Sequence, residues 1–83
     1  MPLEFETVEE FSVDSEVADA TVKVRLRRQT NHNPTRYSRG PYWLDLQVGS
    51  VHVPHYCVDE HFAREAASRF LLEHISGVAP TRH

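Results

Sequence analysis

The chain has 83 residues and a mass of 9.6 kDa, which is enough for one domain with one hydrophobic core. Hydrophobic residues make up 40% and charged residues 25%, a balance typical of an ordinary globular domain that disfavours extensive disorder, a collagen helix or a coiled coil. No apolar run approaches the ~20 residues that span a membrane. The first ten residues lack the features of a secretory signal. We therefore expect a single soluble domain over residues 1–83.

The charges are separated along the chain. Residues 1–19 carry seven acids and no base, whereas residues 23–39 carry six bases and no acid, within a net charge of −3. This separation predicts either pairing inside the fold or two binding surfaces of opposite sign. The single cysteine, Cys57, excludes an intramolecular disulfide and favours a reducing, cytoplasmic compartment.

The amino-terminal half predicts two strands and a loop. Residues 3–13 alternate imperfectly between apolar and polar, which predicts a strand with one bulge, although Phe5, Val8 and Phe11 at a spacing of three leave a short helix as the alternative. Residues 14–19 are polar and predict a turn. Residues 20–27 alternate cleanly and predict a half-buried strand. Residues 29–41 have no apolar periodicity and predict a long basic surface loop.

The following segment predicts a hairpin. Apolar residues alternate over 42–48 and again from Val51, and the Gly49-Ser50 pair between them suits a two-residue type II′ turn. Pro54 lacks an amide donor, which places the fourth strand at a sheet edge or ends its pairing there.

The carboxyl-terminal segment predicts one amphipathic helix. Asp59 is a suitable N-cap, and Phe62, Ala66 and Phe70 recur at a spacing of four. Gly77 and Pro80 predict the end of the helix, with a frayed tail over 78–83. The expected fold is α+β, a small antiparallel four-stranded sheet with one C-terminal helix packed on one face (β-β-β-β-α). The predicted core joins helix and sheet residues: Phe5, Phe11, Val22, Val24, Leu26, Leu44, Leu46, Val51, Val53, Phe62, Ala66, Phe70, Leu71 and Ile75.

The face of the sheet away from the helix has no predicted cover. Alternation places mostly charged side chains there together with Trp43 and Tyr56, and aromatic residues amid arginines are typical of protein–protein hot spots. The alternative is that Trp43 folds down against the arginine stems. The residues expected on this face are Glu4, Glu6, Val8, Glu10, Lys23, Arg25, Arg27, Trp43, Asp45, Gln47, His52 and Tyr56.

The basic segment 23–43 also suggests single-stranded nucleic acid, because its arginines and aromatic residues supply phosphate neutralisation and stacking. Against this, a hairpin turning at residues 16–17 would place Glu10 opposite Lys23 and Glu6 opposite Arg27, so that acidic side chains neutralise basic ones. The net charge of −3 also disfavours a long polyanion.

A metal site and a catalytic site are disfavoured by spacing. His52, His55, Cys57 and His61 are ligand types, but their spacing matches no common zinc pattern, and the lone cysteine lacks a clear base and orienting group. No phosphate-binding loop or nucleophile elbow occurs. We therefore expect no metal, no cofactor and no enzymatic activity.

These observations lead to one functional hypothesis and one alternative. The chain is expected to be a cytoplasmic, non-enzymatic protein-binding module, an accessory or inhibitory protein acting stoichiometrically, such as phage or mobile-element proteins often are, with homodimerisation through the same face as the simplest version. The alternative is a small nucleic-acid-binding protein using segment 23–43. The residues predicted to bind the partner are Arg25, Arg27, Arg36, Tyr37, Arg39, Trp43 and Tyr56.

Overall fold

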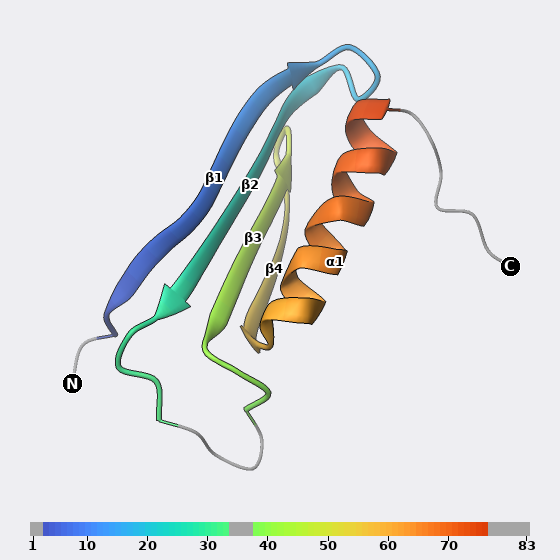
Figure 1. Cartoon of the computed structure of the whole chain (residues 1–83). Helices are drawn as coiled ribbons and strands as arrows, with labels where there is room; N and C mark the ends of the chain where they lie inside the picture. Colours follow the sequence, from blue (N-terminus) through green and yellow to red (C-terminus); the bar gives the residue numbers. More distant parts are fainter. Residues whose placement is uncertain (1–2, 34–37, 77–83) are drawn as a thin grey trace, which may run out of the picture.

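The computed structural model describes residues 3–33 and 38–76. Strands β1 (Phe5–Ser15), β2 (Ala20–Gln29), β3 (Tyr42–Val48) and β4 (Val51–Val58) form one antiparallel sheet in that order (Figure 1). Helix α1 (Glu60–Leu71) and a π-helical turn, η1 (Leu72–Ser76), lie on one face of the sheet. The predicted β-β-β-β-α architecture is confirmed. The expected helix end at Gly77 and Pro80 and the tail 78–83 fall outside the described residues.

Helix α1 begins where the sequence predicts it. The backbone N–H of Phe62 donates to Oδ1 of Asp59 at 2.6 Å, so Asp59 satisfies one of the amides that the first helical turn leaves free. Arg64 donates to Glu9 of β1 at 2.7 Å, and this hydrogen bond raises the pKa of the Arg64 guanidinium above its ordinary value. The helix is therefore held at its first turn and again over β1.

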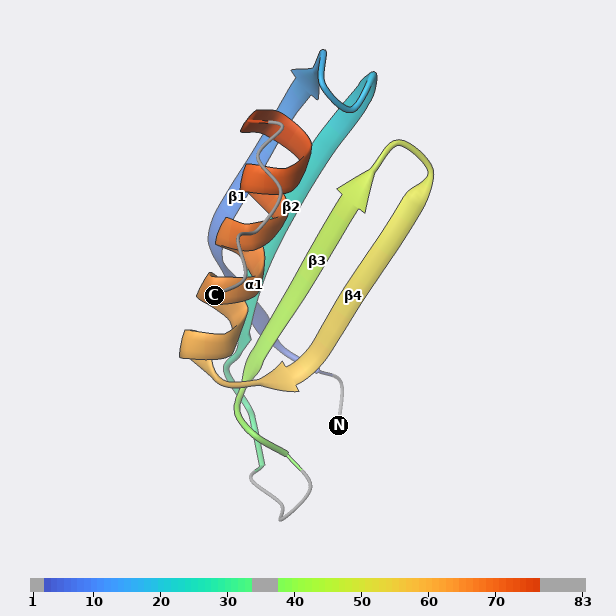
Figure 2. The ribbon, with the colours of Figure 1, turned by 90° about the vertical axis from the view of Figure 1, so that its right-hand side faces the viewer.

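The helix crosses the sheet obliquely. It starts beside the end of β4 and finishes over the β1–β2 turn, so that the turn of the β3–β4 hairpin lies away from it (Figure 2). At the far end the hydroxyl of Ser15 donates to the carbonyl oxygen of His74 at 2.6 Å and accepts from the N–H of Ala18 at 3.1 Å. One buried hydroxyl thus joins the end of the helical segment to the turn between β1 and β2.

The core is smaller than the sequence predicts. Its buried apolar side chains come from β2, β3 and α1. Phe11, Val51, Val53 and Phe62, all predicted to be core, are exposed. The reason is width: a helix is about 10 Å across and covers roughly two strands at ~4.8 Å spacing, so one helix cannot cover four. The buried residues are Val22, Val24, Leu26, Leu44, Leu46, Ala63 and Phe70.

A bulge in β1 reverses the faces of its first residues. The β1–β2 register shifts between Thr7 and Glu9, and Val8 packs against the core rather than lying on the uncovered face as predicted. Side chains before the bulge point to the opposite face from the one that strict alternation predicts. Phe5 therefore pairs with Gln29 and turns away from the helix. The predicted position of Phe5 in the core is therefore wrong, and Glu6 moves to the helix side.

The pairing of acids with bases across β1 and β2 is confirmed, but the predicted register is wrong. The turn spans the four residues 16–19 rather than two, so Glu10 pairs with Arg25 instead of Lys23. The turn and the bulge together pair Glu6 with Arg28 instead of Arg27. Glu10 lies 3.4 Å from Arg25, and Glu6 lies 3.0 Å from Arg28. Exposed pairs of this kind contribute roughly 0.2–1 kcal/mol each.

The β3–β4 hairpin forms as predicted. Val48 pairs with Val51 across a two-residue turn, and Gly49 has φ +57° whereas Ser50 is not among the described residues with positive φ, which matches type II′. Pairing continues on both sides of Pro54, from Val53 to His55. Since proline cannot donate, Pro54 presents its nitrogen to the outer edge of β4, and that edge lacks a donor at its centre.

The described parts of the 29–41 segment are tied to the sheet. Gln29 still belongs to β2, and its N–H donates to the carbonyl oxygen of Pro41 at 2.8 Å. The N–H of Thr30 donates to Glu4 at 2.8 Å, and that of Arg39 donates to Cys57 at 3.1 Å. The described start and end of the segment therefore lie at the same end of the sheet. No helix among residues 3–33 and 38–76 is long and apolar enough to cross a membrane.

Candidate functional site

Three aromatic side chains form a row on the face of the sheet opposite α1, which we call the open face. The ring centroids of Phe5 and Trp43 lie 4.9 Å apart in an edge-to-face arrangement, and those of Trp43 and Tyr56 lie 4.8 Å apart. No described element covers this face (Figure 1). We call Phe5, Trp43, Tyr56 and the adjoining Arg27 the aromatic cluster.

Two bulges bring these residues together. The bulge at Val8 turns Phe5 onto the open face, and the β3–β4 register shifts opposite Trp43, between the Leu44↔His55 and Tyr42↔Val58 pairs. Within that second irregularity Cys57 has φ +54°, in the left-handed region that side chains rarely adopt. Bulges re-aim side chains and are common next to functional sites. Both irregularities act at the same end of the sheet.

Arg27 anchors the cluster to the rest of the open face. Its guanidinium carbon lies 4.8 Å above the centre of the Phe5 ring, and its Nη2 donates to Oδ2 of Asp45 at 3.0 Å. His52 reaches the other carboxylate oxygen of Asp45 at 3.4 Å. The sequence left open a cation–π contact between an arginine and Trp43. The cation–π contact found in the structure joins Arg27 to Phe5, and Trp43 lies between the rings of Phe5 and Tyr56.

Two buried donors in the cluster have no acceptor among the described residues. These are Nε1 of Trp43 and Nε of Arg27, which belong to directly paired residues of β3 and β2. A buried N–H without an acceptor costs about 1–3 kcal/mol. Such groups are uncommon in folded proteins.

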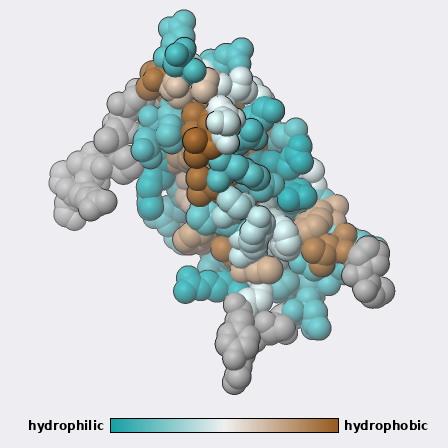
Figure 3. Space-filling view, turned by 180° about the vertical axis from the view of Figure 1, so that it is seen from behind, coloured by the Kyte–Doolittle hydropathy of each residue, from teal (hydrophilic) through white to brown (hydrophobic). Residues whose placement is uncertain are grey.

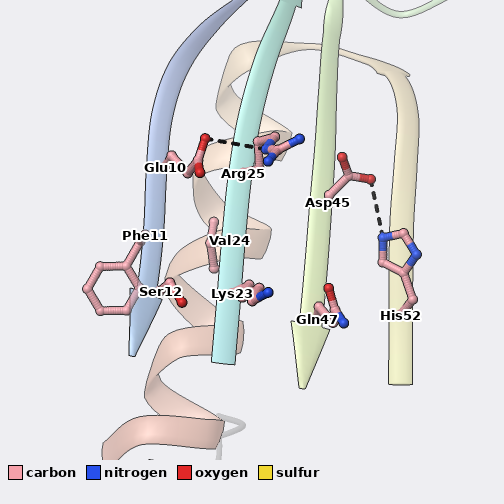
Figure 4. Close-up of a pocket in the computed structure, with 9 residues that line it drawn as sticks. All are labelled: Glu10, Phe11, Ser12, Lys23, Val24, Arg25, Asp45, Gln47 and His52. Carbon is pink, nitrogen blue, oxygen red and sulfur yellow. Dashed lines mark ion pairs between the residues drawn. The ribbon is translucent and has the colours of Figure 1, made fainter. Parts of the chain in front are cut away.

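The other half of the open face is a shallow polar hollow. It encloses about 370 Å³ over β1 to β4, with Glu10 turned toward Arg25 and Asp45 toward His52 (Figure 4). The side chains of Lys23 and Gln47 also stand on this face (Figure 4). Both carboxylates of the hollow are engaged by a cation or a histidine, so the hollow offers fixed charges for recognition rather than a free acid and base.

The structure unites some of the predicted binding residues and not others. Arg27, Trp43 and Tyr56 lie in one cluster, and Arg25 stands farther along the same face in its pair with Glu10. Arg39 is exposed, and its backbone is tied to Cys57, next to Tyr56. The predicted site residues Arg36 and Tyr37 fall outside the described residues.

Phe5 was missed as a site residue. Strict alternation assigns it to the core, and only the position of the bulge reverses that assignment. The usable signal was the Val8–Glu9–Glu10 stretch, where alternation breaks.

The basic segment is largely neutralised where it is described. Arg25, Arg27 and Arg28 each pair with a carboxylate, at 3.4, 3.0 and 3.0 Å. Lys23 and Arg39 have no ion pair with any described residue. Affinity for a polyanion rests on uncancelled positive charge, so this arrangement gives the nucleic-acid alternative little support.

The histidines of β4 lie on opposite sides of the sheet. His52 pairs with Asp45 on the open face, whereas the ring of His55 contacts that of Phe62 on the helix side, with centroids 5.4 Å apart. Within the described part of the chain, no group of three or more His, Cys, Asp or Glu side chains could hold a metal ion.

No protein-family model, no curated protein and no solved structure matches this chain.

Proposed function

We propose that this chain is a non-enzymatic protein-binding module that contacts its partner through the aromatic cluster. The observation that carries the proposal is the row of three touching aromatic rings on an uncovered sheet face, of which the outermost, Tyr56, is 56% exposed. In this proposal Tyr56 and Trp43 anchor by burial, and Arg27 and Arg39 orient the partner by hydrogen bonding to its carboxylates or carbonyl groups.

The cluster is already rigid before binding. Each ring is held by its neighbour, and Arg27 is held by both Phe5 and Asp45, so little rotamer freedom remains to be lost. Tyrosine also has few rotatable bonds for its contact area.

The surroundings suit a binding face. Paired charges flank the cluster, in the way that a polar rim surrounds the apolar centre of an interface. We extend the proposal to a cytoplasmic accessory or inhibitory protein, of the kind that phages and mobile elements encode, that acts at one copy per partner. A second copy docking on the same face is the homodimeric version.

The test compares capture by matched variants. Tagged wild-type protein, Tyr56→Ser and Val17→Ser are each incubated with lysate, with and without nuclease treatment, and chemically crosslinked, and the captured proteins are quantified. Val17 is as exposed as Tyr56 but lies in the β1–β2 turn, away from the cluster. We expect one stoichiometric protein with wild type and Val17→Ser, reduced roughly 30-fold with Tyr56→Ser, as for loss of a hot spot.

Equal capture by Tyr56→Ser would contradict the assignment of the cluster. Capture that depends on intact nucleic acid and falls steeply with salt would instead support the alternative along segment 23–43. Circular dichroism of each variant verifies that the fold is unchanged. Sedimentation of the purified protein decides the homodimeric version, because Tyr56→Ser should then dissociate the dimer.

A further inference from the structure

The helix side of the sheet is left uncovered over β4. Val22 and Val24 of β2 are buried beneath α1, yet Val51 and Val53 of β4, on the same face, are 58% and 41% exposed. A hydrophobic strip runs through a polar surround on the side of the molecule where β4 lies (Figure 3). Leu44 and Leu46 of β3 are buried, so the uncovered apolar surface on this side lies over β4, beside α1.

A groove follows this space along α1. Its floor is formed by Leu46, Ala66 and Phe70, and it encloses about 240 Å³. Phe62, 38% exposed, closes one end with its ring against His55. We call this groove, with the adjoining Val51 and Val53, the β4 groove.

The edge of β4 disfavours an added strand. An extended segment binds a sheet edge through main-chain hydrogen bonds, and Pro54 removes the donor at the centre of that edge. The bulge at Cys57 interrupts the edge further. An occupant of the β4 groove must therefore dock by side chains onto the face, and an α-helix does so.

Within residues 3–33 and 38–76, a second copy of this chain supplies no suitable helix. The outward surface of α1 consists largely of charged and polar residues, among them His61, Arg64, Glu65 and Ser68, all exposed. Packing that surface onto Val51 and Val53 would bury charges without partners. The occupant must present a free apolar stripe, whereas the apolar stripe of α1 is packed on its own sheet.

The rim of the groove sets the charge of the occupant. Glu65 and Glu73 stand on the α1 side, and Glu73 has no ion pair with a described residue. Arg69, the base between them, is already engaged by Glu65 at 3.6 Å. A helix lying there meets a net negative wall, so lysine or arginine beside its apolar stripe complements the rim.

We propose that the β4 groove binds an amphipathic α-helix of another protein, with basic residues along the flank that faces α1. The groove runs from Phe62 to Glu73, about 16 Å at 1.5 Å per residue, which is some three turns of the bound helix. This surface is on the opposite face of the sheet from the aromatic cluster. The two proposals are therefore independent.

The test uses three fluorescent peptides of about 18 residues, long enough to span the groove. One has a leucine stripe flanked by lysine, one has the same stripe flanked by glutamate, and one is a scramble of the lysine peptide. Fluorescence anisotropy at physiological salt should give binding of the lysine peptide at least tenfold tighter than that of the scramble, with the glutamate peptide several-fold weaker.

Amino-acid substitutions test whether the lysine peptide binds in the β4 groove. Val53→Asp and, independently, Phe62→Ser should each weaken the lysine peptide at least tenfold, whereas Glu73→Lys should weaken it several-fold and strengthen the glutamate peptide. Leu72→Asp is the matched control, because Leu72 is an exposed apolar residue that borders a different hollow of the helical segment. Tyr56→Ser should bind like wild type, so failure of this proposal is distinguishable from failure of the open-face proposal.

Three results would overturn the inference. One is the absence of peptide binding, and another is equal binding of the scramble, which would indicate non-specific attraction. The third is a dimer of the free protein that Val53→Asp dissociates, since the groove would then be occupied by a second copy.

Discussion

Replacing Ser15 by alanine tests how the helical segment is held to the sheet. The Ser15 hydroxyl donates to the carbonyl oxygen of His74 at 2.6 Å and accepts from the N–H of Ala18 at 3.1 Å. The first of these bonds joins residues 59 positions apart in the chain. Ser15 is buried, so water does not readily replace the hydroxyl in the variant.

The expected loss follows from these two bonds. Each contributes about 0.5–1.5 kcal/mol net, which gives a combined loss of roughly 1–3 kcal/mol in the free energy of unfolding. A domain of this length has a total stability of about 4–12 kcal/mol, at ~0.05–0.15 kcal/mol per residue. The substitution should therefore remove a substantial fraction of the stability while leaving the packing of the seven buried apolar residues intact.

Urea unfolding followed by circular dichroism and Trp43 fluorescence measures the change. With a slope near ~1 kcal/mol per molar, the midpoint should fall by about 1–3 M. Ser12→Ala is the control, since Ser12 is exposed on the same strand. Amide exchange should also accelerate most in residues 72–76, where the helical segment loses its attachment.

A loss below ~0.5 kcal/mol, or one equal to that of Ser12→Ala, would refute the reasoning, because a buried hydroxyl with two partners must cost more to remove than an exposed one. An unchanged exchange rate over 72–76 would show that packing alone holds the helix end.

Substitutions at four further positions test the fold. Leu44→Ala, at a side chain with 0% exposure, should cost about 2–5 kcal/mol, whereas Val51→Ala, at an exposed site, should change the thermal midpoint little. Gly40→Ala should destabilise the protein in urea unfolding, because a Cβ would meet the backbone oxygen of Val58 at 2.6 Å. Asp59→Ala should cost about 0.5–2 kcal/mol by loss of the helix cap, and Asp59→Asn should retain most of that free energy in the same thermal assay.

The regular elements were predictable because local chemistry decides them. The alternation of residues 20–27, the Gly49-Ser50 turn and the Asp59 cap each depend on a few neighbouring residues, and each is found as predicted. Tertiary context was not needed to place them. The same holds for the hydrophobic stripe of α1, of which Phe70 is buried and Ala66 half-buried.

The incorrect predictions arise from extra residues in a strand or turn and from the limited width of one helix. A one-residue bulge inverts the side chains before it, so Phe5 and Val8 lie on the opposite faces from those predicted. Two extra residues in the β1–β2 turn moved the pairing of Glu10 from Lys23 to Arg25. Likewise, the exposure of Phe62 follows from how far one helix reaches across four strands, which no local pattern encodes. The role of Ser15 could not be predicted from the sequence, because it depends on where the carbonyl oxygen of His74 lies in the folded chain.

The two bulges explain why the aromatic cluster exists. In a regular sheet Phe5 would face the helix, and without the irregularity opposite Trp43 the strand β4 would continue unbroken from His55 to Val58. Each bulge interrupts a ladder, and the second places Cys57 in a left-handed conformation. The first bulge turns Val8 toward the core on the other face and turns Phe5 away from it. The shared effect of the two bulges is to place three rings and Arg27 in contact on the open face, which is the arrangement that a binding surface requires.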